Sequence, residues 1–285
     1  MQVGFIGLGV MGKSMAGHLL QGGCSLQVFT RTRLSAEDLL CEGAVWNDSP
    51  AAIARQCDVI FTIVGFPQDV EEVYFGAEGL VPNMREGAIL VDMTTSRPDL
   101  AKRIATKARS RGGYALDAPV SGGDKGAREA KLSIMVGGDE KAFAGVLPLF
   151  ELMGANIVLQ GPAGSGQYCK MCNQITIAST MIGVCEAMAY AQKSGLDPET
   201  VLKSISSGAA GSWTLDNLAP RMLAEDFAPG FFVKHFIKDM MIAQESARAL
   251  GMETPGLDLA LARYQELAEQ GHEDDGTQAL FKLYL

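Results

Sequence analysis

Apolar runs and polar breaks alternate regularly through the first half of the chain. Short apolar runs, typical of buried strands, alternate with stretches whose apolar residues recur every three or four positions, which is typical of helices. We expect strands at Val3–Ile6, Leu26–Phe29, Val59–Val64, Ala88–Val91, Tyr114–Leu116, Leu132–Val136 and Ile157–Leu159. Between them we expect helices at Met11–Leu20, Leu39–Glu42, Ser49–Gln56, Asp69–Phe75, Pro98–Arg111 and Ala142–Met153. This alternation predicts βαβ units around a parallel sheet.

The pattern changes after Gly161-Pro162. From Gly164 a segment without proline, rich in Ala, Met, Ile and Val, runs through Ser194; it predicts one helix of about 30 residues, roughly 45 Å long. Further helices are expected at Pro198–Ser206, Asn217–Leu223, Phe236–Leu250 and Pro255–Gln270, with a short final one in Thr277–Leu285. We therefore expect an α/β domain of the Rossmann type in residues 1–162 and an all-α domain in residues 163–285, joined by the long helix.

A glycine-rich segment stands between the first predicted strand and the first predicted helix. Gly7-Leu8-Gly9-Val10-Met11-Gly12 has the G-x-G-x-x-G spacing in the strand–turn–helix context of dinucleotide sites. The first glycine permits a tight turn, the second lets a pyrophosphate approach the backbone, and the third lets helix and strand pack closely. The helix N-terminus then faces the phosphates. We expect dinucleotide binding here; the alternative is a glycine-rich turn in an ordinary βα unit.

The end of the second predicted strand bears on the choice of cofactor. A site specific for NAD places an acid near this point to bond the ribose 2′-hydroxyl, but the chain reads Thr30-Arg31-Thr32-Arg33 and has no acid until Glu37. A guanidinium and two hydroxyls suit a 2′-phosphate. We therefore expect NADP, with NAD possible; the alternative is a solvated basic turn.

Two other strand ends carry residues suited to ligands. Val64-Gly65-Phe66 stands at the end of the third strand, at the edge where open α/β sheets bind ligands. Asp117-Ala118-Pro119-Val120-Ser121-Gly122-Gly123 follows Tyr114–Leu116, and its Ser-Gly-Gly turn can aim backbone N–H groups and a hydroxyl at an anion. A hairpin-like loop is the alternative reading of the second segment.

Lys170 lies on the second turn of the predicted long helix, among small and apolar residues. Asn173 and Gln174 follow three and four positions later, so they share its helix face. Polar groups on a buried stripe need partners. From this stretch alone, a structural lysine and a functional lysine both remain open.

Composition and charge exclude several classes of protein. The 285 residues are 47% hydrophobic and carry a net charge of −9, which argues against nucleic-acid binding. No apolar run reaches the ~18 residues of a membrane span. The six cysteines are scattered, and the only histidines, His18, His235 and His272, do not complete a metal site with Cys169-x-x-Cys172. We therefore expect no metal. The first residues lack the basic region of a signal peptide, so we expect a cytoplasmic protein.

Four motifs, in order, resemble those of the β-hydroxyacid dehydrogenases. This family includes 3-hydroxyisobutyrate dehydrogenase, tartronate semialdehyde reductase and glyoxylate/succinic semialdehyde reductase, and is related to 6-phosphogluconate dehydrogenase. The motifs are Gly7–Gly12, Asp117–Gly123, Gly164–Gln174 around Lys170, and Lys238-Asp239, and they cover most of the chain. The chain departs from the family at Thr30, where many members have Asn before the Arg, and at Ala130, where many have Gly.

The resemblance implies a role for each matching residue. The first motif would hold the cofactor pyrophosphate, with Thr95 beside the nicotinamide and Lys238 reaching the cofactor. Ser121, Gly122 and Gly123 would bind the substrate carboxylate, with Asn173, Phe231 and Asp239 completing the substrate site. Lys170 would be the catalytic proton donor and acceptor.

The implied reaction is hydride transfer between NADP(H) and a short 3-hydroxy acid or semialdehyde. The partners would be a small carboxylate-bearing substrate and further copies of the chain, in a homodimer or homotetramer. Two alternatives stay open: a dinucleotide-binding protein without turnover, and an imine-reductase-like enzyme. Inactive relatives are expected to lose the lysine, and imine reductases lack it at this position, so the presence of Lys170 argues against both.

Overall fold

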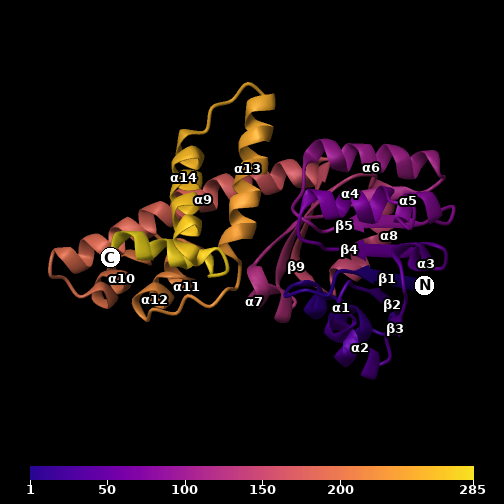
Figure 1. Ribbon diagram of the computed structural model, residues 1–285, viewed down its shortest axis with the longest axis horizontal. Coiled ribbons are helices and arrows are strands. Elements are labelled where there is room, and N and C mark those ends of the chain that lie inside the picture. Colours follow the sequence, from indigo (N-terminus) through magenta and orange to yellow (C-terminus); the bar gives the residue numbers. More distant parts are fainter. The chain divides into compact units, whose positions relative to one another are not determined.

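The computed structural model describes residues 1–285, which form two compact units, Met1–Lys170 and Met171–Leu285. We call them the sheet unit and the helical unit. The division falls inside one helix, α9 (Ser165–Lys193), whose first turns belong to the sheet unit. Figure 1 shows the strands in the first unit and only helices in the second. The predicted fold class, a Rossmann-type α/β part followed by an all-α part, is confirmed.

The sheet unit is built on nine strands in the order β3-β2-β1-β4-β5-β6-β8-β7, with β9 beside β8. Strands β1 to β6 are all parallel, and their order is that of the dinucleotide-binding doubly wound fold. β8 runs antiparallel to β6 and β7 and parallel to β9. The strands are β1 Gln2–Ile6, β2 Ser25–Phe29, β3 Val45–Trp46, β4 Val59–Thr62, β5 Ile89–Asp92, β6 Tyr114–Asp117, β7 Val120–Ser121, β8 Leu132–Gly137 and β9 Gly154–Gly161.

Helices cover both faces of this sheet because successive strand residues point to opposite sides. Phe5 and Phe61 join a core with α1 and α8, whereas Ile6 and Ile60 join a second core with α3, α4, α5 and α6. Figure 1 shows α4, α5 and α6 together on one side of the strands and α1 on the other. The helices are α1 Gly12–Gln21, η1 Arg33–Ala36, α2 Glu37–Cys41, α3 Pro50–Ala54, α4 Pro67–Phe75, α5 Leu80–Asn83, α6 Pro98–Ser110, α7 Gly123–Arg128 and α8 Glu140–Phe150.

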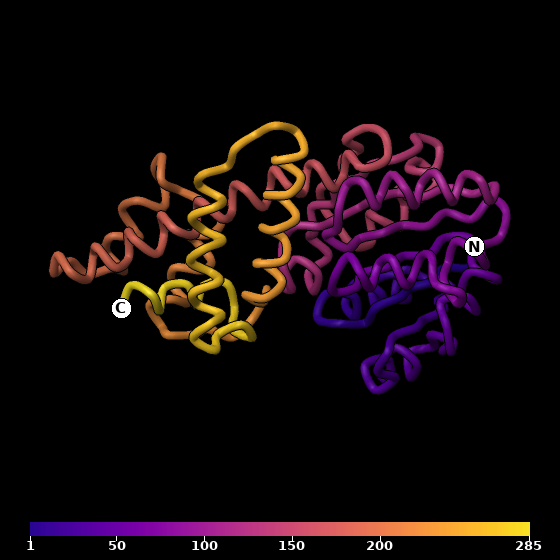
Figure 2. Tube along the Cα trace, turned by 45° about the horizontal axis from the view of Figure 1, so that its top comes forward, coloured from indigo at the N-terminus to yellow at the C-terminus, as the bar shows by residue number.

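The helical unit packs the rest of α9 with five shorter α-helices, a π-helical turn and a final 3₁₀ helix. Its core contains Met181, Phe236, Tyr264 and Phe281, and the tube in Figure 2 shows α13 and α14 running side by side. The elements are α10 Pro198–Ile205, α11 Trp213–Asn217, α12 Ala219–Leu223, α13 Val233–Ala249, α14 Pro255–Leu267, a π-helical turn Ala268–His272 and a 3₁₀ helix Thr277–Tyr284. None of the helices combines the length and the apolar character needed to cross a membrane.

The structure differs from the predicted elements mainly where segments are short. β3, β7, η1, α5, α7 and α11 were not predicted; each has six residues or fewer, too few for a periodic pattern to be recognised. The segment after Ser121, expected to be only a turn, continues into α7. Helix α4 begins at Pro67 rather than Asp69, since proline suits the first position of a helix.

Candidate active site

The glycine-rich loop between β1 and α1 contains two kinds of glycine. Gly7 has a φ of +97°, and an added Cβ would lie 2.0 Å from the carbonyl oxygen of Ile63. At Gly12 an added Cβ would lie 1.9 Å from the oxygen of Gly7. Gly9 is different, because no atom beyond its chain neighbours lies within 4 Å of the position of its added Cβ. Gly7 and Gly12 therefore serve the turn and the packing, while Gly9 leaves an open approach to the backbone.

The N-terminus of α1 suits the binding of an anion. Met11, at the N-cap, makes no capping hydrogen bond, and the first turn contains no acidic residue. The first N–H groups of a helix lack partners within the helix and attract negative charge. Together with the open approach at Gly9, this end of α1 fits the pyrophosphate of a dinucleotide.

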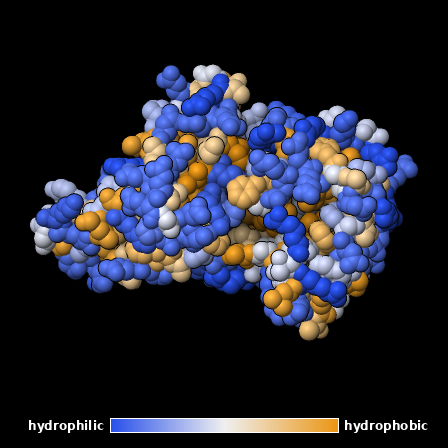
Figure 3. Space-filling view, in the orientation of Figure 1, coloured by the Kyte–Doolittle hydropathy of each residue, from blue (hydrophilic) through white to orange (hydrophobic).

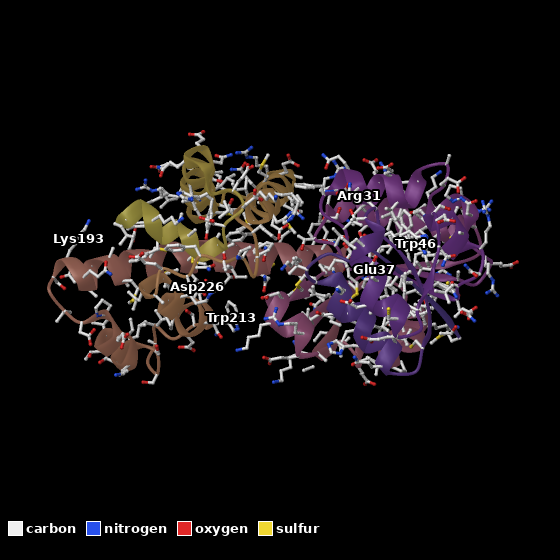
Figure 4. All side chains as sticks on the ribbon, turned by 60° about the horizontal axis from the view of Figure 1, so that its bottom comes forward. Arg31, Glu37, Trp46, Lys193, Trp213 and Asp226 are labelled. Atoms are coloured by element: carbon white, nitrogen blue, oxygen red, sulfur yellow. The ribbon has the colours of Figure 1, made fainter.

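The loop after β2 presents Arg31 to solvent. The Arg31 side chain is 83% exposed, and its guanidinium lies 3.2 Å from Asp69 Oδ1. Asp69 is held in place because its other oxygen accepts a hydrogen bond from the N–H of Phe66. Arg33 lies over the ring of Trp46 in β3, 5.3 Å from its centroid. Figure 4 labels Arg31, Glu37 and Trp46 on this unit; Glu37, the first acid after β2, begins helix α2.

The loop after β5 brings a hydroxyl-rich segment to the same edge of the sheet as the glycine loop. The Thr94 hydroxyl accepts a hydrogen bond from the N–H of Val64, 3.0 Å away, so the loops after β4 and β5 are tied together. The buried carboxylate of Asp92 accepts bonds from the N–H of Thr94 and the hydroxyl of Thr62. Burial raises the pKa of Asp92 to about 7.

Asp117, at the end of β6, holds the first turn of α9. Its two oxygens accept hydrogen bonds from the N–H groups of Gly164, at 2.7 Å, and Gln167, at 2.8 Å. Burial raises the pKa of Asp117 to about 6, while these hydrogen bonds act in the opposite direction. The same segment then continues into Ser121-Gly122-Gly123, where Gly122 and Gly123 have φ angles of +128° and +62°. These values favour glycine at both positions.

Lys170 lies beside that glycine turn. The residue is only 6% exposed, and Nζ donates a hydrogen bond of 2.9 Å to the carbonyl oxygen of Val120, the residue before Ser121. The fold therefore brings together two of the predicted groups, the lysine and the Ser-Gly-Gly turn, which are far apart in the sequence.

In the helical unit a chain of polar contacts links Asn173, Gln174, Asp239 and Lys238. Asn173 Nδ2 donates to Gln174 Oε1 at 2.7 Å, and Gln174 Nε2 donates to Asp239 Oδ2 at 2.6 Å. Lys238 Nζ lies 2.9 Å from Asp239 Oδ1. Asp239 is almost completely buried, so its carboxylate orients Gln174 and Lys238. Phe231 packs against Phe236 of α13, with ring centroids 5.6 Å apart.

Sequence reasoning gave no role to Asp117, Gln167 or Asp92. Asp117 and Gln167 lie inside two of the sequence motifs, and their contacts join residues 47 to 73 positions apart in the chain. No local pattern could have indicated them. The six cysteines are free thiols, and no group of three or more His, Cys, Asp or Glu side chains is placed to hold a metal ion.

Two family models match consecutive parts of the chain. Residues 2–161 match the NAD binding domain of 6-phosphogluconate dehydrogenase. Residues 164–284 match the model described as the NAD-binding domain of NADP-dependent 3-hydroxyisobutyrate dehydrogenase. Together they account for nearly the whole sequence.

Individual proteins resemble the chain over its full length. It is 61% identical to an uncharacterized oxidoreductase, YkwC, of Bacillus subtilis (strain 168), over 99% of this chain and 98% of that one. It is 42% identical to the 2-hydroxy-3-oxopropionate reductase of Escherichia coli (strain K12), over 98% and 94%. The solved structure of Mycobacterium tuberculosis 3-hydroxyisobutyrate dehydrogenase with L-serine superposes with a TM-score of 0.90 at 29% identity, covering 99% of both chains.

Proposed function

Because the chain belongs to the β-hydroxyacid dehydrogenase family, we propose that it transfers a hydride between NADP(H) and a short 3-hydroxy acid or its semialdehyde, with Lys170 as proton donor and acceptor. The family makes the protein an NAD(P)-dependent oxidoreductase of the 3-hydroxyisobutyrate dehydrogenase type. NADP, the substrate class and the role of the lysine are the parts that we propose.

The observation that carries the proposal is the contact between Lys170 and Val120. A buried primary amine held 2.9 Å from the carbonyl oxygen before Ser121 lies next to a turn whose backbone N–H groups and hydroxyl suit a carboxylate. A substrate carboxylate bound at Ser121-Gly122-Gly123 would therefore bring a carbonyl or hydroxyl group one or two carbons away close to Lys170. This argument favours small acids over simple aldehydes.

The residues of the chain would then act as follows. A bound nicotinamide supplies or accepts the hydride at the carbon that bears the reacting oxygen. In reduction, that oxygen gains negative charge, and the ammonium of Lys170 would stabilise the charge and donate the proton that completes the alcohol. In oxidation, the neutral amine of Lys170 would take the hydroxyl proton. The Ser121 segment keeps the acid in place in both directions.

The proposed preference for NADP depends on Arg31. Its exposed guanidinium follows β2, where the adenine ribose of a bound dinucleotide is held in this fold, and Thr30 and Thr32 flank it with hydroxyls. Glu37 starts α2 rather than ending β2. An Arg in this position accommodates a 2′-phosphate, whereas an NAD site needs an acid for the 2′-hydroxyl.

A panel of small semialdehydes and hydroxy acids, assayed by nicotinamide absorbance with NADPH and with NADH, tests the proposed function. We expect turnover of one or more acids with three or four carbons, with a higher kcat/KM for NADPH than for NADH. Binding of NADPH without turnover of any panel member would instead support a non-catalytic dinucleotide-binding protein.

The same proposal includes self-association into a homodimer or homotetramer. Several large apolar side chains are more than half exposed on the helical unit: Tyr190, Leu196, Trp213, Leu250, Met252 and Leu259. Figure 3 shows scattered hydrophobic residues on a mostly hydrophilic surface, and Figure 4 labels Trp213 on the helical unit. Light scattering should give a multiple of the chain mass of 30.3 kDa; a single-chain mass at micromolar concentration would contradict this part of the proposal.

A further inference from the structure

Gln167 is a fully buried polar side chain on the first turn of α9, three residues before Lys170. Its amide makes two directed hydrogen bonds. Nε2 donates to the carbonyl oxygen of Thr94 at 2.8 Å, and Oε1 accepts from the N–H of Ser96 at 3.0 Å. One side chain therefore satisfies a backbone acceptor and a backbone donor of the loop after β5.

These two bonds flank Thr95, the residue that we expect beside the nicotinamide. Because the Gln167 amide reaches the residues on both sides of Thr95, it fixes the position of this loop relative to α9. Residues three apart on a helix lie on the same face, so the side of α9 that contacts the loop is also the side from which Lys170 extends. Gln167 thus connects the loop of Thr95 to the helix of the lysine.

The first turn of α9 has a second fixed point on the sheet. Asp117 accepts hydrogen bonds from the N–H groups of Gly164 and Gln167. At Gly166 an added Cβ would lie 2.4 Å from the oxygen of Met135 and 2.5 Å from that of Asp117, so helix and strand backbones are in direct contact. The helix cannot rotate about its axis without breaking these contacts.

We propose that Gln167 is a positioning residue for Lys170: its amide holds the first turn of α9 against the loop of residues 94–96, and so sets the amino group relative to the reacting carbon. This inference rests on the proposed function, in which Lys170 transfers the proton. The hydrogen bonds of the Gln167 amide go to Thr94 and Ser96, so we expect its effect to reach Lys170 through the helix. A displacement of about 1 Å of a catalytic group is enough to reduce turnover by roughly a hundredfold.

The experiment combines Gln167→Met with Lys170→Ala in a double-mutant cycle in the full-length chain. Methionine has a similar length and volume but cannot make the two hydrogen bonds. Gln167→Glu has nearly the same shape and keeps an acceptor for Ser96 but loses the donor to Thr94, so it serves as a second variant if the methionine variant does not fold. Tyr168→Phe is the matched control, because it removes the hydrogen bond that Lys102 donates to this neighbouring residue on α9. Circular dichroism and the thermal midpoint report on folding.

We expect Gln167→Met to lower kcat by about 10- to 100-fold with saturating NADPH, while the Kd for NADPH stays within threefold. In the Lys170→Ala background, followed at high enzyme concentration, the same change should lower the residual kcat by no more than about threefold, because the group that it positions is absent. Tyr168→Phe should leave kcat within twofold.

Two results would overturn the inference. An equal loss of kcat in both backgrounds would mean that Gln167 acts independently of Lys170. A raised Kd for NADPH with unchanged kcat would mean that it serves the cofactor loop alone. A near-normal kcat of Lys170→Ala itself would refute the proposed function, and this outcome is read from the single variant before the cycle is completed.

Discussion

Replacement of Lys170 by alanine is the most direct test of the chemistry. The variant removes the amine of a residue that is 6% exposed, and this amine donates a hydrogen bond to the carbonyl oxygen of Val120. If the amine only supports the structure, the cost is that of leaving the oxygen of Val120 without its donor, about 1–3 kcal/mol of folding stability. Turnover would then change little once the protein is folded. If the amine donates the proton, turnover must fall.

The expected loss follows from the two tasks assigned to the amine. Loss of general acid catalysis lowers rates by ~10²–10⁴-fold, which corresponds to about 3–5 kcal/mol at 1.36 kcal/mol for each factor of ten. Loss of charge stabilisation at the reacting oxygen adds to this figure. We therefore expect Lys170→Ala to lower kcat by at least about a hundredfold, while NADPH binding changes by no more than a few-fold.

Controls separate proton transfer from packing. Lys170→Met fills most of the same space without a donor and should lose as much activity as the alanine variant. Lys170→Arg should restore little, because a guanidinium stays protonated and has a different shape. Lys102→Met removes a lysine that contacts α9 through the hydroxyl of Tyr168, and should keep kcat within twofold. The assay is NADPH oxidation with the best semialdehyde, with NADPH affinity measured by fluorescence titration. Near-normal kcat in Lys170→Ala would refute the reasoning, and Lys238 would then be the first residue to test.

Three further predictions follow from the sites described above. Arg31→Ala should raise the KM for NADPH roughly tenfold or more, as expected for loss of a charge-assisted bond, and hardly change that for NADH; equal effects on both cofactors would show that Arg31 does not bind the 2′-phosphate. Changing the substrate carboxylate to an amide should abolish most turnover, whereas comparable rates on simple aldehydes would contradict the role of Ser121-Gly122-Gly123. Burial raises the pKa of Asp92 from 3.8 to about 7, so the folded protein binds this proton more tightly than the unfolded chain does. The contribution of the proton to the free energy of unfolding is therefore fully present below about pH 4 and is lost as the pH rises through about 7. Asp92→Asn can keep both accepted hydrogen bonds and should reduce the fall in thermal midpoint over this range; an unchanged slope would argue against the raised pKa.

The parts of the fold that could be predicted are those with a local cause. The main parallel strands of the sheet unit are four or five residues long and mostly apolar, and the strand–loop–helix order around Gly7–Gly12 gives the nucleotide loop. β3, only Val45 and Trp46, depends on pairing with β2 rather than on its own sequence. Helix α7 contains two glycines in its six residues, and its formation depends on the surrounding structure rather than on helix propensity.

The individual residues of the candidate site could be predicted from the sequence, but the contacts between them could not. The sequence pattern indicates Lys170 and the Ser121 turn separately, but the bond between Lys170 and Val120 joins residues 50 apart in sequence. The same holds for Arg31. No acid follows it in the sequence until Glu37, yet Asp69 reaches it from α4, 38 residues further on. A surface ion pair of this kind contributes about 0–1 kcal/mol, so it lowers the affinity of Arg31 for a phosphate only slightly.

The open position at Gly9 has a consequence for how such a protein can change over time. In the same loop, Gly7 and Gly12 are fixed by the chain's own backbone, so a side chain at either one conflicts with folding itself. An added Cβ at Gly9 has nothing within 4 Å beyond its chain neighbours, so a side chain there would intrude on a nucleotide bound at this loop. Mutation can therefore weaken or abolish nucleotide binding in one step while the fold persists. An ancestor of this kind could give rise to a folded descendant that has lost the cofactor, free to be selected for a different role.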